Sequence, residues 1–336
     1  MQPDFARLSE DGNAMAKTIS RRKLIQMGLG AGSALLMGEK LSMASTSNDS
    51  SKQNKTQVEK QSQQAGKLNV AAVQFRSTDN LSDNVKRHCD YIRSCAKNGA
   101  RVVIFPECSM TGYSKEAIDK ATPALLTEAE ATIGAACKEA NVYAIVGSPT
   151  KTDTGLFNSA LVFTPEAKII ERYHKVQLAE SWPKPGDHMS VFPIDGVWCS
   201  IIICHDERYP ELVRLPVLAG AKIVFYISSE SGIKEERKIA PYRAQIMARA
   251  AESPVYIAHA NAPCNAKDLS GSHGQSRLID SDGNIITEAS IFDEEVISTT
   301  FDVTKGTGGL ARRSAQCEFL KKWWEDGVAL VRRIEG

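Results

Sequence analysis

Three side chains of complementary chemistry follow apolar runs in this sequence. Glu107 follows R-V-V-I-F-P, Lys175 follows I-I-E-R-Y-H, and Cys204 follows W-C-S-I-I-I. Sites in α/β proteins form beyond strand ends, so a carboxylate, an ammonium and a thiol at three such ends can converge. A thiol can attack a carbonyl carbon, a carboxylate can take and return its proton, and an ammonium can stabilise the oxyanion. These residue types together therefore indicate covalent acyl transfer. Taken singly, Glu107 also fits a turn cap and Lys175 a solvated loop lysine.

Cys204 has the sequence context of a nucleophile at a sharp turn. Residues 197–203 are apolar and rich in β-branched side chains, as in a buried strand, and polar residues follow Cys204 at once. Pro210 and Glu211 suit the first turn of a helix, where proline needs no N–H and glutamate lies at the positive end of the dipole. A cysteine between these elements is exposed among N–H groups that stabilise a thiolate. Taken alone, the stretch also fits a buried structural cysteine.

Alternating strand and helix patterns are expected to position the three residues. The predicted helices are 81–97, 128–140, 210–219 and 241–252, with a further helix at 319–332. The predicted strands are 68–75, 101–105, 143–147, 157–163, 168–174, 191–194, 197–203, 223–227, 255–260, 278–279, 285–286 and 297–303. T-P-E-A and D-S-D-G-N are hairpin turns between two pairs of these strands. The pattern predicts one α/β domain at 67–304, followed by a tail at 305–336 that serves oligomer contacts.

The composition is that of an ordinary globular protein. The chain has 336 residues, a net charge of +1 and 24% charged residues. It has no excess of basic residues of the kind that would indicate nucleic-acid binding. Eight cysteines in an exported protein suggest disulfides, but their density is below that of a stapled scaffold, and most are expected to be reduced core residues. Cys199, Cys204 and His205 lack a second Cys/His pair at finger spacing, which argues against zinc.

The first 66 residues have the layout of an export signal and a linker. Arg21 and Arg22 form a twin-arginine pattern, an apolar run covers 27–37, and Ser42-Met43-Ala44 supplies small residues for cleavage. That run is too short to span a bilayer. We therefore predict a signal peptide at 1–45, a flexible polar linker at 46–66, the twin-arginine export machinery as a partner, and a periplasmic or secreted protein. A disordered basic N-terminus is the alternative.

Three sequence blocks resemble the nitrilase, or carbon–nitrogen hydrolase, superfamily. They are F-P-E-C-S-M-T-G-Y at 105–113, Y-H-K-V-Q-L at 173–178 and C-H-D-E-R-Y-P-E at 204–211, in the family's order. Further similarity lies at 249–256, 260–261, 274–276 and 282–283, so the resemblance covers about residues 68–303. It implies an αββα sandwich and hydrolysis of non-peptide C–N bonds without a metal or organic cofactor.

The resemblance implies roles for individual residues. Glu107 would be the general base and acid, Lys175 the oxyanion stabiliser and Cys204 the nucleophile, with the backbone N–H of His205 completing the oxyanion hole. Family members often carry a second glutamate, for which Glu180 is the candidate. The substrate pocket is expected to include Tyr113, Trp182, Ser229 and Glu230; the last would favour a cationic substrate end if it faces the pocket, and a solvated loop glutamate is the alternative.

The context of the cysteine bears on the reaction. The nitrile-hydrolysing branch resembles Cys-Trp-Glu, whereas this chain has Cys204-His205-Asp206, more similar to the amidase and carbamoylase branches. The expected substrate is therefore a small amide or N-carbamoyl compound. Nitrile hydrolysis by the same triad, and a catalytically idle nitrilase-like binding or assembly protein, are the alternatives. The enzyme itself is expected to be a homo-oligomer, a dimer or larger.

Overall fold

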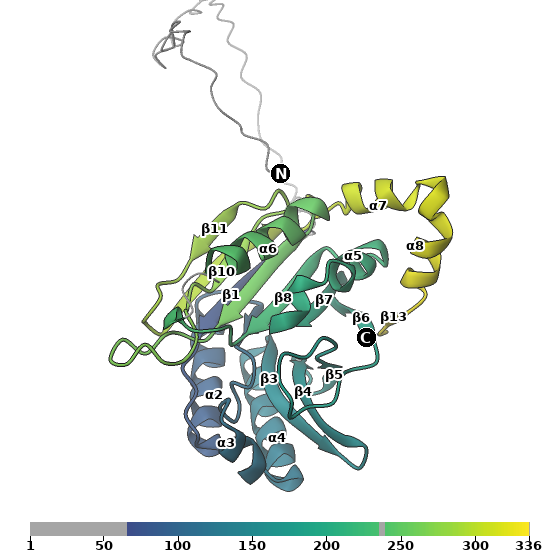
Figure 1. Ribbon diagram of the computed structural model, residues 1–336. Helices are drawn as coiled ribbons and strands as arrows, with labels where there is room; N and C mark the ends of the chain where they lie inside the picture. Colours follow the sequence, from purple (N-terminus) through teal and green to yellow (C-terminus); the bar gives the residue numbers. More distant parts are fainter. Residues whose placement is uncertain (1–65, 235–238, 336) are drawn as a thin grey trace, which may run out of the picture. The chain divides into compact units, whose positions relative to one another are not determined.

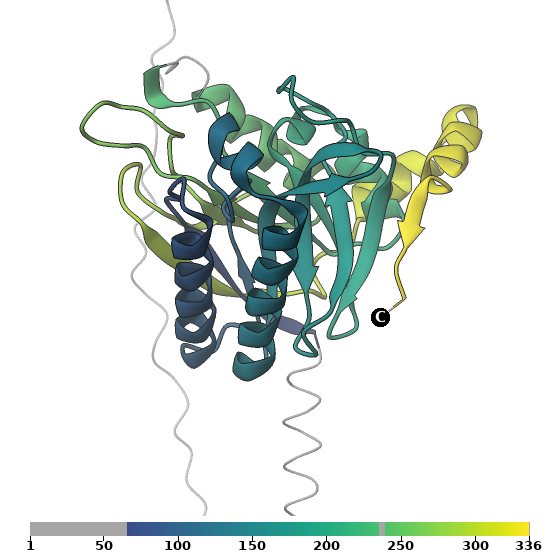
Figure 2. The same cartoon turned by 90° about the horizontal axis from the view of Figure 1, so that it is seen from below.

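The computed structural model describes residues 66–234 and 239–335, which form a four-layer αββα sandwich (Figures 1 and 2). The predicted signal peptide at 1–45 and all of the linker except Gly66 lie outside the described residues. The family-like sandwich predicted from the sequence is therefore confirmed for the folded part of the chain.

Two sheets form the inner layers. The six-stranded sheet has the order β12 (Glu295–Asp302), β1 (Lys67–Gln74), β2 (Val102–Ile104), β3 (Tyr143–Thr152), β4 (Gly155–Phe163) and β5 (Ile169–His174). The seven-stranded sheet has the order β11 (Ile285–Glu288), β10 (Arg277–Ile279), β9 (Tyr256–Asn261), β8 (Ile223–Ser228), β7 (Val197–Ile203), β6 (Met189–Ile194) and β13 (Val331–Arg333). Both predicted hairpins, β4–β5 and β10–β11, are antiparallel pairs and are confirmed.

Helices cover the outer face of each sheet. Helices α2 (Leu81–Lys97), α3 (Lys115–Lys120) and α4 (Pro123–Ala140) belong to the six-stranded side, where α2 and α4 share a buried cluster with β1–β5. Helices α5 (Glu211–Leu218) and α6 (Ile239–Glu252) pack on the seven-stranded sheet. The largest buried cluster fills the space between the sheets. Central strands such as β2 and β8 are therefore buried on both faces, which explains their continuous apolar runs, whereas the strands β11, β12 and β13 are partly exposed.

Local capping sets helix boundaries that periodicity missed. Helix α4 begins at Pro123, five residues before the predicted start at 128, because Thr122 accepts from the backbone N–H of Leu125 and proline occupies the first turn. It ends at Asn141, whose left-handed conformation (φ 53°) terminates the helix. The short helix α3, capped by Ser114, was not predicted.

The tail differs from the predicted helix at 319–332. Helix α7 (Gly309–Ala315), a 3₁₀ turn η3 (Glu318–Leu320) and helix α8 (Lys321–Val328) precede β13, which pairs in parallel with β6. Gly327 weakens the last turn of the helix, and the apolar β-branched Val331 suits the open edge of the sheet. In the described ranges, no helix is long and apolar enough to cross a membrane.

The topology brings four strand ends to one edge of the sandwich. Strands β1, β2 and β3 run parallel in one sheet, and β7, β8 and β9 run parallel in the other. Glu107 follows β2, Cys204 follows β7 and Ser229 follows β8. Lys175 follows β5, at the outer edge of the six-stranded sheet. The carboxylate and the amine thus come from one sheet and the thiol from the other.

Candidate active site

Glu107 is buried, and both of its carboxylate oxygens accept hydrogen bonds. Its Oε1 accepts from Lys175 Nζ at 2.9 Å and from Asn158 Nδ2 at 2.7 Å, and its Oε2 accepts from the backbone N–H of Ser229 at 2.9 Å. Burial raises the pKa of Glu107 to about 7, against the opposing charge of Lys175. A carboxyl group with that pKa can take and return a proton near neutral pH.

Lys175 is fully buried between two carboxylates. Its Nζ donates to Glu107 Oε1 at 2.9 Å and to Glu180 Oε1 at 2.6 Å. Burial by itself lowers the pKa of Lys175, but Glu107, the nearby Cys204 and Glu180 outweigh it and raise the pKa above its usual range. The amine therefore stays charged. An ammonium has three N–H donors, so one remains for an oxyanion after these two contacts.

Glu180, the second glutamate expected from the resemblance, lies in this array. Burial raises its pKa, but Lys175 and the hydroxyl of Tyr113 outweigh that effect and hold the pKa below its usual value. The Tyr113 hydroxyl donates a hydrogen bond to the same Oε1 that accepts one from Lys175 Nζ. Two carboxylates with pKa values shifted in opposite directions flank one ammonium. Glu107 is therefore the group suited to proton transfer, and Glu180 the group that stays ionised.

Cys204 occupies a strained turn at the end of β7. Its φ of 43° lies in the left-handed region, which is uncommon for a residue with a side chain, and the 3₁₀ turn Cys204–Arg208 begins there. The residue is partly exposed. Burial of the thiol, and then the charge of Glu107, raise the pKa of Cys204 well above its ordinary value, although Lys175 opposes them. Glu107 is the nearby group that can accept the proton of this thiol, and the charge of Lys175 favours its loss.

Gly147 of β3 lies against the Glu107 turn. A Cβ at this position would lie 2.3 Å from Pro106 O, 2.5 Å from Cys108 N and 2.7 Å from Glu107 Cα. These are backbone atoms, which cannot rotate away. The backbone N–H of Met110 also donates to Gly147 O at 3.0 Å. Only glycine allows β3 to support the turn that presents Glu107.

The predicted pocket residues differ in their burial and in their contacts. Ser229 contributes its backbone N–H, rather than its hydroxyl, to Glu107. Trp182 is half-buried in the loop after Glu180. Glu230 is buried: its Oε1 accepts from the Tyr226 hydroxyl at 2.5 Å and its Oε2 lies 2.9 Å from His273 Nε2. It is therefore a buried residue and not a solvated loop glutamate.

Sequence reasoning did not identify Asn158 as part of the site. It is fully buried in β4, and its side-chain amide donates to Glu107. Its backbone carbonyl accepts a hydrogen bond from the backbone N–H of Lys175 at 2.8 Å. An amide within the apolar run F-N-S-A-L-V-F was the available signal. Arg249 lies in one of the segments that resemble the family, and its Nε donates to the backbone carbonyl of Glu207 at 2.9 Å, which links α6 to the turn after Cys204.

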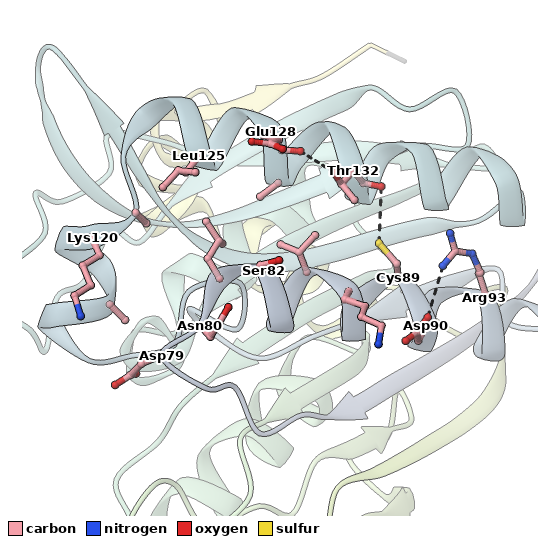
Figure 3. A pocket seen from close by; sticks show the side chains of 16 residues that line it. Asp79, Asn80, Ser82, Cys89, Asp90, Arg93, Lys120, Leu125, Glu128 and Thr132 are labelled. Carbon is pink, nitrogen blue, oxygen red and sulfur yellow. Dashed lines mark hydrogen bonds and ion pairs between the residues drawn. The ribbon is translucent and has the colours of Figure 1, made fainter.

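Other features of the described residues do not contribute to this array. A hollow of about 750 Å³ lies between α2, α3 and α4, lined by Leu81, Val85, Cys89 and Leu125 among others, and it contains no predicted site residue (Figure 3). Within 66–234 and 239–335, no group of three His, Cys, Asp or Glu residues is placed to hold a metal ion. All eight cysteines are free thiols, most of them buried, as expected for reduced core residues.

The fold and this arrangement of residues define the class of protein. The chain belongs to the carbon-nitrogen hydrolase family, whose family model matches residues 69–307. Among curated relatives, omega-amidase NIT2-B of Xenopus laevis is 27% identical over 250 residues, covering 70% of this chain and 89% of that protein. Omega-amidase NIT2 of Homo sapiens is 25% identical over 249 residues, with the same coverage of each chain.

Solved structures of the superfamily share the fold. An amidase from Nesterenkonia sp. has a TM-score of 0.67 at 18% identity, covering 76% of this chain and 96% of that chain. Saccharomyces cerevisiae Nit3, a member of branch 10 of the nitrilase superfamily, has a TM-score of 0.66 at 21% identity, covering 75% and 96%. The family, the nitrilase-like fold and the class of carbon–nitrogen hydrolase are therefore established, in agreement with the resemblance seen in the sequence.

Proposed function

We propose that the protein hydrolyses amide or N-carbamoyl substrates through a thioester on Cys204. The observation that carries this proposal is the buried array in which Lys175 lies between Glu107 and Glu180, with Cys204 close enough for all three charges to affect its pKa. Several relatives are named omega-amidases, and a superfamily amidase has been captured with acrylamide added to its active-site cysteine. The names support amide hydrolysis, and the acrylamide adduct, formed by Michael addition in a mutant of that amidase, supports a nucleophilic thiol.

In the first half of the proposed cycle, Glu107 takes the proton of the Cys204 thiol as sulfur attacks the carbonyl carbon. The oxyanion is stabilised by the third N–H of Lys175 and by the backbone N–H of His205. The C–N bond then breaks, and the proton on Glu107 passes to the leaving ammonia or amine. A thioester remains, and Glu107 is again a carboxylate.

In the second half, water replaces the departed amine. Glu107 takes one proton from water as its oxygen attacks the thioester carbon, and Lys175 again stabilises the oxyanion. The C–S bond breaks, the acid leaves, and the proton returns to Cys204. No oxidant, reductant or cofactor is needed, because each proton removed by Glu107 is returned within the cycle.

Ammonia release from a panel of amides, N-carbamoyl compounds and nitriles tests the substrate class. We expect turnover of an amide or carbamoyl compound and little of any nitrile, because the residue after Cys204 is His205, unlike the Trp of the nitrile-hydrolysing branch. A nitrile turned over faster than every amide would establish the alternative reaction. No turnover, together with eight cysteines of ordinary reactivity, would indicate an idle scaffold.

We also propose export by the twin-arginine route to the periplasm or beyond, with cleavage near Ala44. The support is the order of Arg21-Arg22, the short apolar run and the small residues. Replacing both arginines by lysine should leave the full-length protein in the cytoplasm. Export of that variant at the normal level would contradict the proposal.

Assembly as a homo-oligomer through the tail is a further part of the proposed function. Five large apolar side chains of α7, η3, α8 and the residue before β13 are well exposed: Leu310, Phe319, Leu320, Trp323 and Leu330. Apolar surface of this kind commonly marks an interaction site. Light scattering should give a dimer or larger assembly, and Phe319→Ser with Trp323→Ser should reduce its mass. A wild-type monomer at micromolar concentration would refute it.

A further inference from the structure

Asp206 joins the two segments that carry the lysine and the cysteine. Its side chain is completely buried two residues after Cys204. Its Oδ1 accepts from the backbone N–H of Gln177 at 2.7 Å, and its Oδ2 accepts from the Tyr173 hydroxyl at 2.8 Å and from the backbone N–H of Ile203 at 3.0 Å. One carboxylate therefore receives three donors from two distant parts of the chain.

The positions of these donors matter for the site. Tyr173 precedes Lys175 by two residues and Gln177 follows it by two, so Asp206 holds the lysine segment on both sides. Ile203 directly precedes Cys204, so the same carboxylate also holds the strained turn of the thiol. Tyr173 lies next to the last residue of β5 in one sheet, and Ile203 ends β7 of the other. The carboxylate thus connects the two sheets at the point where their side chains must meet.

We propose that Asp206 is a positioning residue that fixes the Cys204 thiol relative to the Lys175 ammonium. This inference rests on the roles proposed for those two residues, and Asp206 itself touches neither reacting group. A carboxylate suits the task because it offers acceptors in both directions without a competing donor. Asparagine has nearly the same shape, but in either orientation its NH₂ group faces a backbone N–H, of Gln177 or of Ile203. One of the two links is then lost.

Asp206→Asn in the full chain is the principal test. Because misplacement of a catalytic group by about 1 Å costs roughly 10²-fold in rate, we expect kcat to fall about 10²-fold while KM changes less than about threefold. The thiol should also react more slowly. The rate of Cys204 alkylation by iodoacetamide is measured by peptide mass spectrometry relative to the exposed Cys317. This relative rate should fall at least about fivefold, because Glu107 is no longer placed to accept the proton of the thiol.

The labelling experiment separates positioning from general loosening of the fold. A loosened variant would expose its thiols, so both Cys204 and the buried Cys199 of the preceding strand β7 would react faster than in the wild type. Labelling also needs no substrate. If wild-type Cys204 is no more reactive than Cys317, the proposed function fails; if it is hyper-reactive and Asp206→Asn leaves it so, only the positioning role fails.

Two further variants complete the test. Glu171→Gln is the matched control. Glu171 is a buried carboxylate on the same face of β5 as Tyr173, but it pairs with His188 at 3.5 Å. We expect it to keep kcat within about twofold. Tyr173→Phe removes one donor and leaves both backbone links, so kcat should fall by about three- to tenfold, which keeps the proposal testable if Asp206→Asn does not fold. Wild-type kcat in folded Asp206→Asn or in Tyr173→Phe, or an equal loss in Glu171→Gln, would overturn the role.

Discussion

Gly147→Ala should displace the catalytic carboxylate without touching a polar group. The new Cβ would lie 2.3–2.7 Å from backbone atoms of residues 106–108, whereas carbon atoms in ordinary contact are separated by about 3.5–4.0 Å. Strand β3 is held on both sides by its neighbours, so relief requires a shift of about 1 Å in the turn that carries Glu107.

The expected loss follows from that shift. A misplacement of about 1 Å costs roughly 10²-fold in kcat, equivalent to about 2.7 kcal/mol in the barrier. Overpacking should reduce the free energy of unfolding by about 1–3 kcal/mol, which most domains survive. Ammonia release gives kcat and KM, and thermal melting shows that the variant is folded.

A glycine in a helix provides the matched control. Gly134 of α4 is also buried, and a Cβ there would lie no closer than 3.3 Å to its nearest neighbour, Ala167 O. We expect Gly134→Ala to keep kcat within about twofold, because it lies outside the turn that carries Glu107. If folded Gly147→Ala also turned over at the wild-type rate, the inference that β3 fixes the position of Glu107 would be refuted.

Three further predictions concern the charged array. Because burial raises the pKa of Glu107 to about 7, kcat/KM should rise with pH through that value, and the free energy of unfolding should fall between about pH 4.5 and 7. Glu107→Gln should abolish both trends. Urea melts in which the unfolding free energy of the wild type does not fall over this pH range would contradict the prediction. Lys175→Met leaves two buried carboxylates without their cation, so it should lower kcat by about 10²–10³-fold and the unfolding free energy by about 3–5 kcal/mol. An unchanged urea midpoint would be evidence against the buried ion pairs of Lys175. Tyr113→Phe removes one donor to Glu180 and should cost about 1 kcal/mol of stability and less than tenfold in kcat; a complete loss of turnover would give the hydroxyl a direct role instead.

The strands and the ends that carry Glu107 and Cys204 could be predicted because local patterns determine them. Apolar β-branched runs such as 101–105 and 197–203 are buried on both faces, and polarity changes at their carboxyl ends. The Lys175 position followed from a hairpin signal that the β4–β5 pairing confirms. Periodicity could not give the start of α4, because the Thr122 cap, rather than the apolar pattern, determines it.

The environment of each charge could not be predicted, because it depends on residues far away in the chain. In the sequence alone, Lys175 also fits a solvated loop lysine. In the structure it is fully buried and forms ion pairs with two carboxylates. The pKa of Cys204 is likewise raised first by burial of the thiol and then by the charge of Glu107, almost one hundred residues earlier in the chain. Asp206 was visible only as part of a motif, since its three donors come from other segments and from the preceding strand.

Mass spectrometry of the enzyme quenched with acid during turnover tests the central claim most directly. With an amide or N-carbamoyl substrate, the peptide that contains Cys204 should gain the mass of the acyl group minus one hydrogen, and Cys204→Ala should show neither adduct nor turnover. An acyl group on a different residue, or wild-type ammonia release by folded Cys204→Ala, would contradict the thioester mechanism.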